Sequence, residues 1–183
     1  MLIGYSIVGE DNDTFMFDNA TMYNKCSKCG IINDKTNTTF LNKLNKRYDF
    51  SYTYDGCCIV SKKFKEFCYK NNYKGIKFKE ISNAHDYFLF VVDNVLKFDV
   101  VKSNIKFEKF CNVCKRYYSI TPAYPIILNE KNKVLKDSFY RTDIEFGSGN
   151  EQSPVIIIGI ETWRKLKKNM FSGLYAEKIY SIP

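Results

Sequence analysis

Several features that would assign this chain to a protein class are missing from it. No stretch approaches the roughly 20 consecutive apolar residues of a membrane-spanning helix, so we expect no membrane span. The apolar run from Met1 to Val8 has no basic start and stops at Gly9, unlike a secretory signal peptide. Prolines number only 4 in 183 residues, and 45% of residues are hydrophobic, which argues against disorder. We therefore expect one globular, cytoplasmic domain spanning 1–183.

Histidine is nearly absent, since His85 is the only one. A cysteine nucleophile needs an activating base, and Cys57, Cys58 and Cys68 show no recognisable arrangement with His85. No other set of residues has a catalytic pattern. The sequence therefore predicts a protein that is not an enzyme and has no catalytic residues.

The 7 cysteines are an odd number and we expect no signal peptide, which favours a metal site or free thiols over disulfides. Cys26 and Cys29 form one Cys-x-x-Cys pair, and Cys111 and Cys114 form a second. Zinc takes four ligands in a tetrahedron, so the two pairs together supply one complete site. We expect these four cysteines to bind one structural Zn²⁺ per chain, with free or redox thiols as the alternative.

The local sequence around the pairs favours metal over redox chemistry. A reactive Cys-x-x-Cys starts a helix, and neither pair is followed by a helical pattern. Gly30 permits the positive φ that turns backbone amides toward sulfur, and Lys115 holds the matching place in the second pair. Far more residues separate the pairs than the roughly 15 to 20 of a compact zinc ribbon. We therefore expect a split zinc-ribbon-like site whose halves are joined by the fold.

A weak internal repeat appears when Gly75 is aligned with Gly173 (173 − 75 = 98). It places the apolar residues 57–60 on 155–158, and in both copies a basic segment with helical spacing follows. Each copy therefore predicts a buried strand, a helix and a second strand, with the glycine in the left-handed conformation that ends a helix. The repeat also gives Cys57, Cys58 and Cys68 core-packing equivalents.

The two expected helices differ in their details. Ser61 is the expected N-cap of the first helix and Thr162 that of the second, because both can accept a hydrogen bond from the first turn. The expected core-facing residues are Phe64, Phe67 and Cys68 in the first helix and Trp163, Leu166 and Met170 in the second.

Further strands are expected from β-prone segments at 2–8, 48–54 and 124–128. The stretch from Tyr87 to Phe98 is interrupted by Asp93-Asn94 and predicts a hairpin. The fold class is therefore α+β, with a mixed or antiparallel sheet, two similar strand-helix-strand units and the split zinc-ribbon-like site.

Residues 139–146 alternate, so that Arg141, Asp143 and Glu145 share one face of a strand. We interpret this face as the candidate partner-binding surface. The alternative is an exposed strand whose charges pair with their neighbours.

The net charge of +8 allows an anionic partner. The basic residues of the two units are Lys62, Lys63, Lys65, Lys70, Lys74, Lys77 and Lys79 in the first, and Arg164, Lys165, Lys167 and Lys168 in the second. With tyrosines between them, they could form a nucleic-acid-binding surface; the alternative is two solvated helix faces.

Taken together, the two cysteine pairs, residues 59–65, residues 72–75 and residues 140–143 resemble the bacterial double-CXXCG motif proteins, which are associated with immunity proteins of contact-dependent and polymorphic toxin systems. The first motif matches over 26–30, whereas the second has Lys115 where the family pattern has glycine. The resemblance implies a non-enzymatic protein that neutralises a cognate toxin by binding it. A nucleic-acid-binding zinc protein that acts through lysine-rich helix faces is the alternative.

Overall fold

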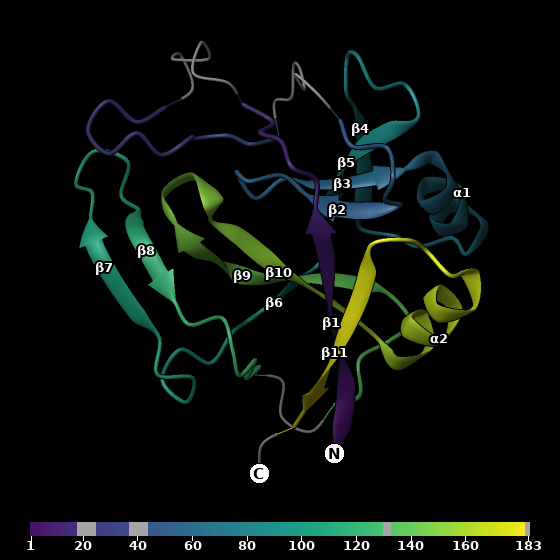
Figure 1. Ribbon diagram of the computed structural model, residues 1–183. Coiled ribbons are helices and arrows are strands. Elements are labelled where there is room, and N and C mark those ends of the chain that lie inside the picture. The colour runs from purple at the N-terminus through teal and green to yellow at the C-terminus, as the bar shows by residue number, and fades with distance from the viewer. Residues whose placement is uncertain (18–24, 37–43, 130–132, 182–183) are drawn as a thin grey trace.

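The computed structural model describes residues 1–17, 25–36, 44–129 and 133–181. In this part of the chain, eleven strands form one sheet and two α-helices pack against it (Figure 1). β1 runs parallel to β2 and antiparallel to β10 and β11, so the sheet is mixed. The predicted α+β class with a mixed sheet is confirmed at this level. None of the described helices is long and apolar enough to cross a membrane.

The strands are β1 (Leu2–Asp11), β2 (Phe50–Tyr52), β3 (Cys58–Ser61), β4 (Ile76–Glu80), β5 (Tyr87–Val92), β6 (Val95–Leu96), β7 (Lys106–Phe110), β8 (Tyr117–Thr121), β9 (Phe139–Ser148), β10 (Ser153–Ile158) and β11 (Leu174–Tyr180). The helices are α1 (Lys62–Lys70) and α2 (Ile160–Asn169), and a short 3-10 helix, η2, spans Gly149–Glu151.

The predicted repeat is present as two four-stranded units. The first has the strand order β4-β5-β3-β2, and the second has the matching order β11-β1-β10-β9. In each unit a helix connects a central strand to an outer one. The units join because the last residues of β1, Glu10 and Asp11, pair with Ser51 and Tyr52 of β2.

The two helices begin differently. Ser61 is the N-cap of α1, as predicted, and its hydroxyl accepts a hydrogen bond from the backbone N–H of Phe64 at 3.2 Å. Thr162 as N-cap of α2 was wrong, because α2 begins after Gly159. Thr162 is instead fully buried, and its hydroxyl donates to the Asp137 carboxylate at 2.9 Å.

The buried faces of the helices follow the repeat. Phe64, Phe67 and Cys68 are buried in α1, as predicted. In α2 the buried residues are Thr162 and Leu166, which the repeat aligns with Phe64 and Cys68. Met170, expected in this stripe, is 84% exposed because it has left the helix.

The left-handed residues that end the helices are also not the predicted glycines. Asn72 (φ 54°) follows α1 and Met170 (φ 46°) follows α2, and these positions are equivalent in the repeat. Gly75 (φ 70°) and Gly173 (φ 76°) do adopt positive φ, but they lead into β4 and β11.

The predicted hairpin over 87–98 was wrong. β5 is flanked by β3 and β4, which leaves no free side for β6, and β6 pairs in parallel with β9 instead. Asn94 holds the chain where it passes from β5 to β6, since its side-chain amide donates to the backbone oxygens of Lys74 (3.0 Å) and Phe139 (2.9 Å). The strand expected at 124–128 is likewise absent from the described residues, apart from one isolated bridge between Leu128 and Phe98.

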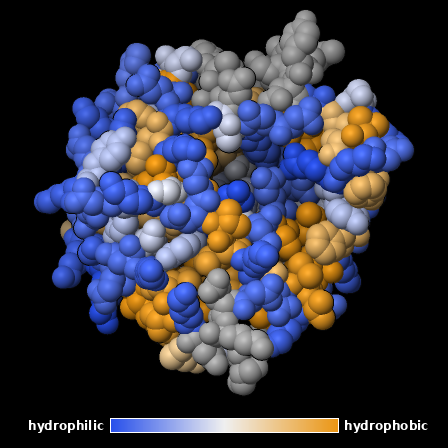
Figure 2. Space-filling model, turned by 180° about the vertical axis from the view of Figure 1, so that it is seen from behind, coloured by the Kyte–Doolittle hydropathy of each residue, from blue (hydrophilic) through white to orange (hydrophobic). Residues whose placement is uncertain are grey.

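The largest core cluster lies between the helices and the sheet. Phe50, Phe64 and Phe139 are fully buried there, and the Phe64 ring lies 5.4 Å from that of Phe50 and 6.0 Å from that of Phe139. Two smaller clusters lie on the opposite face of the sheet, because they contain the alternate residues of the same strands, such as Ile59 of β3 and Ile157 of β10. The rear of the molecule is largely hydrophilic, with hydrophobic residues gathered mainly in its lower half (Figure 2).

Candidate metal centre and adjoining cleft

The fold brings the two Cys-x-x-Cys pairs together. The sulfur atoms of Cys26, Cys29, Cys111 and Cys114 all lie within 4.8 Å of one another. The Sγ atoms of Cys26 and Cys111 are 3.8 Å apart, and those of Cys29 and Cys114 are 3.6 Å apart. Four thiols at this spacing fit around one tetrahedral metal ion, because each would be about 2.3 Å from its centre. The four residues could therefore hold a metal.

The two halves of the centre have the same backbone geometry. The Gly30 N–H donates to the Cys26 carbonyl at 2.9 Å, and the Lys115 N–H donates to the Cys111 carbonyl at 2.9 Å. Gly30 has φ 74°, as expected, and Lys115 has φ 60° although it is not glycine. A second hydrogen bond closes each turn. The Cys26 N–H donates to the Ile31 carbonyl and the Cys111 N–H donates to the Arg116 carbonyl, both at 2.8 Å. The second half is therefore built like the first despite its missing glycine.

The same turns direct backbone N–H groups at sulfur. Hydrogen bonds from the backbone of Cys29 and Lys28 lower the pKa of Cys26 to about 6. Those from Cys114 and Val113 lower the pKa of Cys111. The thiolate, not the thiol, is the metal ligand, so this geometry favours the binding form of the first cysteine in each turn.

The other three cysteines are buried packing residues. Burial raises the pKa of Cys57 to about 12, and it raises the pKa values of Cys58 and Cys68 as well. All three thiols are therefore protonated at neutral pH. His85 lies at an exposed position between β4 and β5. This agrees with the core-packing interpretation of these cysteines.

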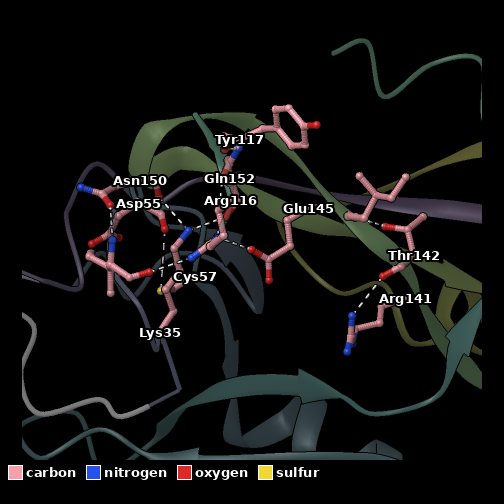
Figure 3. A network of polar contacts seen from close by, with 12 residues as sticks. Lys35, Asp55, Cys57, Arg116, Tyr117, Arg141, Thr142, Glu145, Asn150 and Gln152 are labelled. Carbon is pink, nitrogen blue, oxygen red and sulfur yellow. Dashed lines mark hydrogen bonds and ion pairs between the residues drawn. The ribbon is translucent and has the colours of Figure 1, made fainter. Parts of the chain in front are cut away.

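Arg116 connects the metal centre to strand β9. It directly follows the second cysteine turn, and its guanidinium donates to the Ile32 carbonyl at 2.9 Å, beside the first turn. The same group pairs with the Glu145 carboxylate at 2.8 Å (Figure 3). The buried Gln152 completes the junction by donating to the Tyr117 carbonyl at 3.0 Å.

Lys35 is a second link that the sequence did not reveal. Its ammonium group donates to the backbone oxygens of Asn150, at 2.7 Å, and Gln152 (Figure 3). Burial lowers the pKa of Lys35. The Asn150 amide in turn accepts from the Ile32 N–H at 2.8 Å. A lone lysine in a turn-rich loop carries no sequence signal for this role.

Arg141, Asp143 and Glu145 line one cleft of about 600 Å³, beside the metal centre. Arg141 donates from Nε to the Val92 carbonyl at 3.0 Å, whereas Asp143 accepts from the Phe98 N–H at 2.9 Å. Arg141 also donates to the carbonyl of Thr142 within β9, at 3.1 Å, so the charges of this face engage groups both on and outside the strand. Their part in partner binding stays a prediction.

Several lysines of the two helical units are engaged with acidic groups. Lys63 pairs with Asp49 at 3.3 Å and Lys77 with Asp93 at 2.8 Å, while Lys165 pairs with Asp137. The pairs of Lys63 and Lys165 reduce the charge that the helix faces could offer to phosphates, and the pair of Lys77 does the same for β4.

No protein-family model matches the chain, and no curated protein matches it in sequence.

Proposed function

We propose that the four clustered cysteines bind one structural Zn²⁺ and that the chain is a non-enzymatic, zinc-stabilised binding protein of the bacterial cytoplasm. The observation that carries this proposal is the set of four cysteine sulfurs within 4.8 Å of one another. Thiolates in a tetrahedral set favour zinc over harder divalent ions. A catalytic zinc keeps one ligand position for water or substrate, whereas four cysteines fill all four positions.

The centre supports a split zinc ribbon. Each cysteine pair lies on a tight turn, and the second turn connects β7 to β8, as the loops of a ribbon do. Through Arg116, the residue after this turn, the centre holds Glu145 at the cleft. The metal would thus stabilise the surface on which a partner binds.

The proposed partner is a cognate toxin, which the chain would neutralise by binding it directly, as an immunity protein. The support for this is the sequence resemblance to the double-CXXCG proteins together with the shared turn geometry at Gly30 and Lys115. Arg141, Asp143 and Glu145 are the proposed contact residues, because they lie together on one concave surface.

The test uses the product of the neighbouring reading frame, expressed in a bacterial host with and without this chain. We expect that product to stop growth, the chain to restore it, and the two purified proteins to bind in calorimetry. The Arg141→Ala substitution should weaken binding by about tenfold or more, as loss of an interface arginine does. Lys168→Ala, at an exposed position of α2, is the matched control. A neighbouring product that is neither toxic nor bound would contradict the proposal.

The alternative, nucleic-acid binding through the helix faces, differs in its salt dependence. Phosphate contacts weaken steeply and log-linearly between about 50 and 200 mM salt, whereas a shaped protein interface need not. The ion pairs of Lys63 on α1 and Lys165 on α2 count against these faces. The exposed hairpin of β7 and β8 suits nucleic acid better than the helix faces do.

A further inference from the structure

The hairpin of β7 and β8 carries an exposed cluster of three aromatic rings. Phe107, Phe110 and Tyr117 are 40%, 54% and 36% exposed. The Tyr117 ring lies 5.1 Å from that of Phe107 and 5.0 Å from that of Phe110, so the three rings form one surface. We call these three residues the aromatic trio.

The trio depends on an unusual backbone conformation. Residues three apart on a regular strand point to opposite faces, so Phe107 and Phe110 should not share a neighbour. Lys109 lies between them with φ 53°, in the left-handed region that favours glycine. This residue turns the strand, and both rings then contact Tyr117. Conformations of this kind persist where the surrounding structure holds them, often at binding sites.

The hairpin is also strongly basic. Residues 101–121 contain Lys102, Lys106, Lys109, Lys115 and Arg116 but only one carboxylate, Glu108. Lys109 extends over the Tyr118 ring, with its Nζ 5.6 Å from the ring centroid. Strand β7 ends the strand order of the sheet, and all five of its residues are exposed. The rings and the positive charges therefore face solvent together.

The cleft extends this surface toward β9. Phe107 and Tyr117 line it together with Lys35, Lys115, Arg116 and Arg141. Its three carboxylates accept bonds from the chain itself. Those bonds come from Arg116 to Glu145, from the Phe98 N–H to Asp143 and from Thr36 to Asp34. Among the described residues, neither Arg141 nor Lys35 has a carboxylate at ion-pair distance, and both donate to backbone oxygens. The four cations of this cleft outnumber the three carboxylates by one, so the cleft carries a small net positive charge.

We infer that this hairpin binds single-stranded nucleic acid, with bases stacked on the aromatic trio and phosphates held by the hairpin lysines and the cleft cations. Aromatic side chains that stack bases beside a positively charged groove are the usual means of binding a single strand without reading its sequence. The positive charge alone would also suit an acidic protein surface, but the exposed aromatic rings beside it favour a single strand, whose bases stack on them. The surface shares the cleft, and Arg141 in it, with the proposed toxin contact, but a test with an oligonucleotide does not require the toxin.

Fluorescence anisotropy with a labelled oligothymidylate of about 12 nucleotides tests it, a length that one such surface can span. We expect saturable binding by the zinc-loaded chain at low salt, with affinity falling log-linearly as salt rises. Tyr117→Ala and Phe110→Ala should each weaken binding about tenfold, the loss expected for one stacked base. Tyr69→Ala is the matched control, because Tyr69 is an exposed tyrosine on the lysine-rich helix α1.

A variant that keeps an aromatic ring separates stacking from folding. Phe110→Trp should retain binding, and its added indole fluorescence should be quenched when the oligonucleotide stacks on it. Three results would each overturn the inference: no oligonucleotide binding by folded, zinc-loaded protein; an unchanged indole signal; or a loss with Tyr69→Ala that equals the loss with Tyr117→Ala. The first would leave the trio to a protein partner, and the last would place the site on the helix face.

Discussion

Asp49, in the first unit, accepts a hydrogen bond from the backbone N–H of Ser172 in the second, at 3.0 Å. The reverse contact also exists, because Asp137 in the second unit accepts from the hydroxyl of Tyr73 in the first, also at 3.0 Å. The two aspartates precede β2 and β9, which hold equivalent places in the two units. The units are therefore joined by reciprocal polar contacts as well as by the sheet.

The Asp49 contacts predict a loss of stability in acid. Burial opposes ionisation of Asp49, but hydrogen bonds from the Ser61 hydroxyl and the Ser172 N–H hold its pKa below the usual value. Because the folded pKa is the lower one, this stabilisation is fully present above the unfolded pKa of about 3.9 and is lost as pH falls through the folded pKa. Asp49→Asn should cost about 1.5–3 kcal/mol at neutral pH.

Urea unfolding at neutral pH and near pH 3 checks this prediction. The difference in free energy of unfolding between wild type and Asp49→Asn should be smaller near pH 3 than at neutral pH. Asp86→Asn, at an exposed position, serves as the control. A difference that stays constant with pH would show that the charge of Asp49 does not contribute to stability.

Thr162 provides a prediction about a buried hydroxyl. Its Oγ1 lies 2.9 Å from the Asp137 carboxylate and 3.3 Å from the Ser138 carbonyl. Thr162→Val keeps the shape but removes the donor, and it should destabilise the fold by about 1–3 kcal/mol. Thr162→Ser keeps the hydroxyl and should cost less. Chemical denaturation would compare them, and a valine variant as stable as wild type would rule out this role.

The metal centre predicts a definite stoichiometry. Protein purified without added zinc should carry about one ion per chain by elemental analysis. Cys111→Ser should lose the ion. Where the concentration of free zinc exceeds the dissociation constant of the site about 1,000-fold, the variant should also lose about 4 kcal/mol of stability relative to wild type. Cys68→Ala should keep the ion, because Cys68 lies in the core away from the cluster. Wild-type protein that contains no metal and has freely titratable thiols would refute the zinc proposal.

The two cysteine turns predict opposite effects of glycine and alanine. Lys115→Gly removes left-handed strain of about 1–2 kcal/mol, partly offset by the greater freedom of glycine when unfolded, so it should stabilise by up to about 1 kcal/mol. Gly30→Ala should destabilise by about 1 kcal/mol. Its Cβ would meet nothing within 4 Å, so the cost is conformational alone. Thermal unfolding of the zinc-loaded variants measures both, and equal signs would contradict the shared geometry.

Local chemistry made the metal cluster and the repeat visible in the sequence. The spacing within Cys26–Cys29 and Cys111–Cys114 identified the four sulfurs, and the apolar runs identified β3 and β10. Contacts between distant residues were not visible. Asn94 binds the backbone of Phe139, which sends the chain to β9 instead of into a hairpin. The buried place of Thr162 depends in the same way on Asp137.

The cleft was only partly predictable for the same reason. Alternation placed Arg141, Asp143 and Glu145 on one face, and the structure does bring them to one cleft. The sequence pattern gave no sign of Lys35, whose partners lie more than 100 positions later in the chain. Nor did it indicate the aromatic trio, because no propensity rule predicts a left-handed lysine at position 109.

The place of β1 in the sheet has a consequence for synthesis of the chain. Among the described strands, β1 is translated before the others, whereas its partners β10 and β11 are translated after them. The first unit, from β2 to β5, is continuous in sequence and can assemble on the ribosome, whereas the second must wait until its final strands emerge. Closing that long loop is slow, so the free β1 is the segment most exposed to mispairing in the newly made protein.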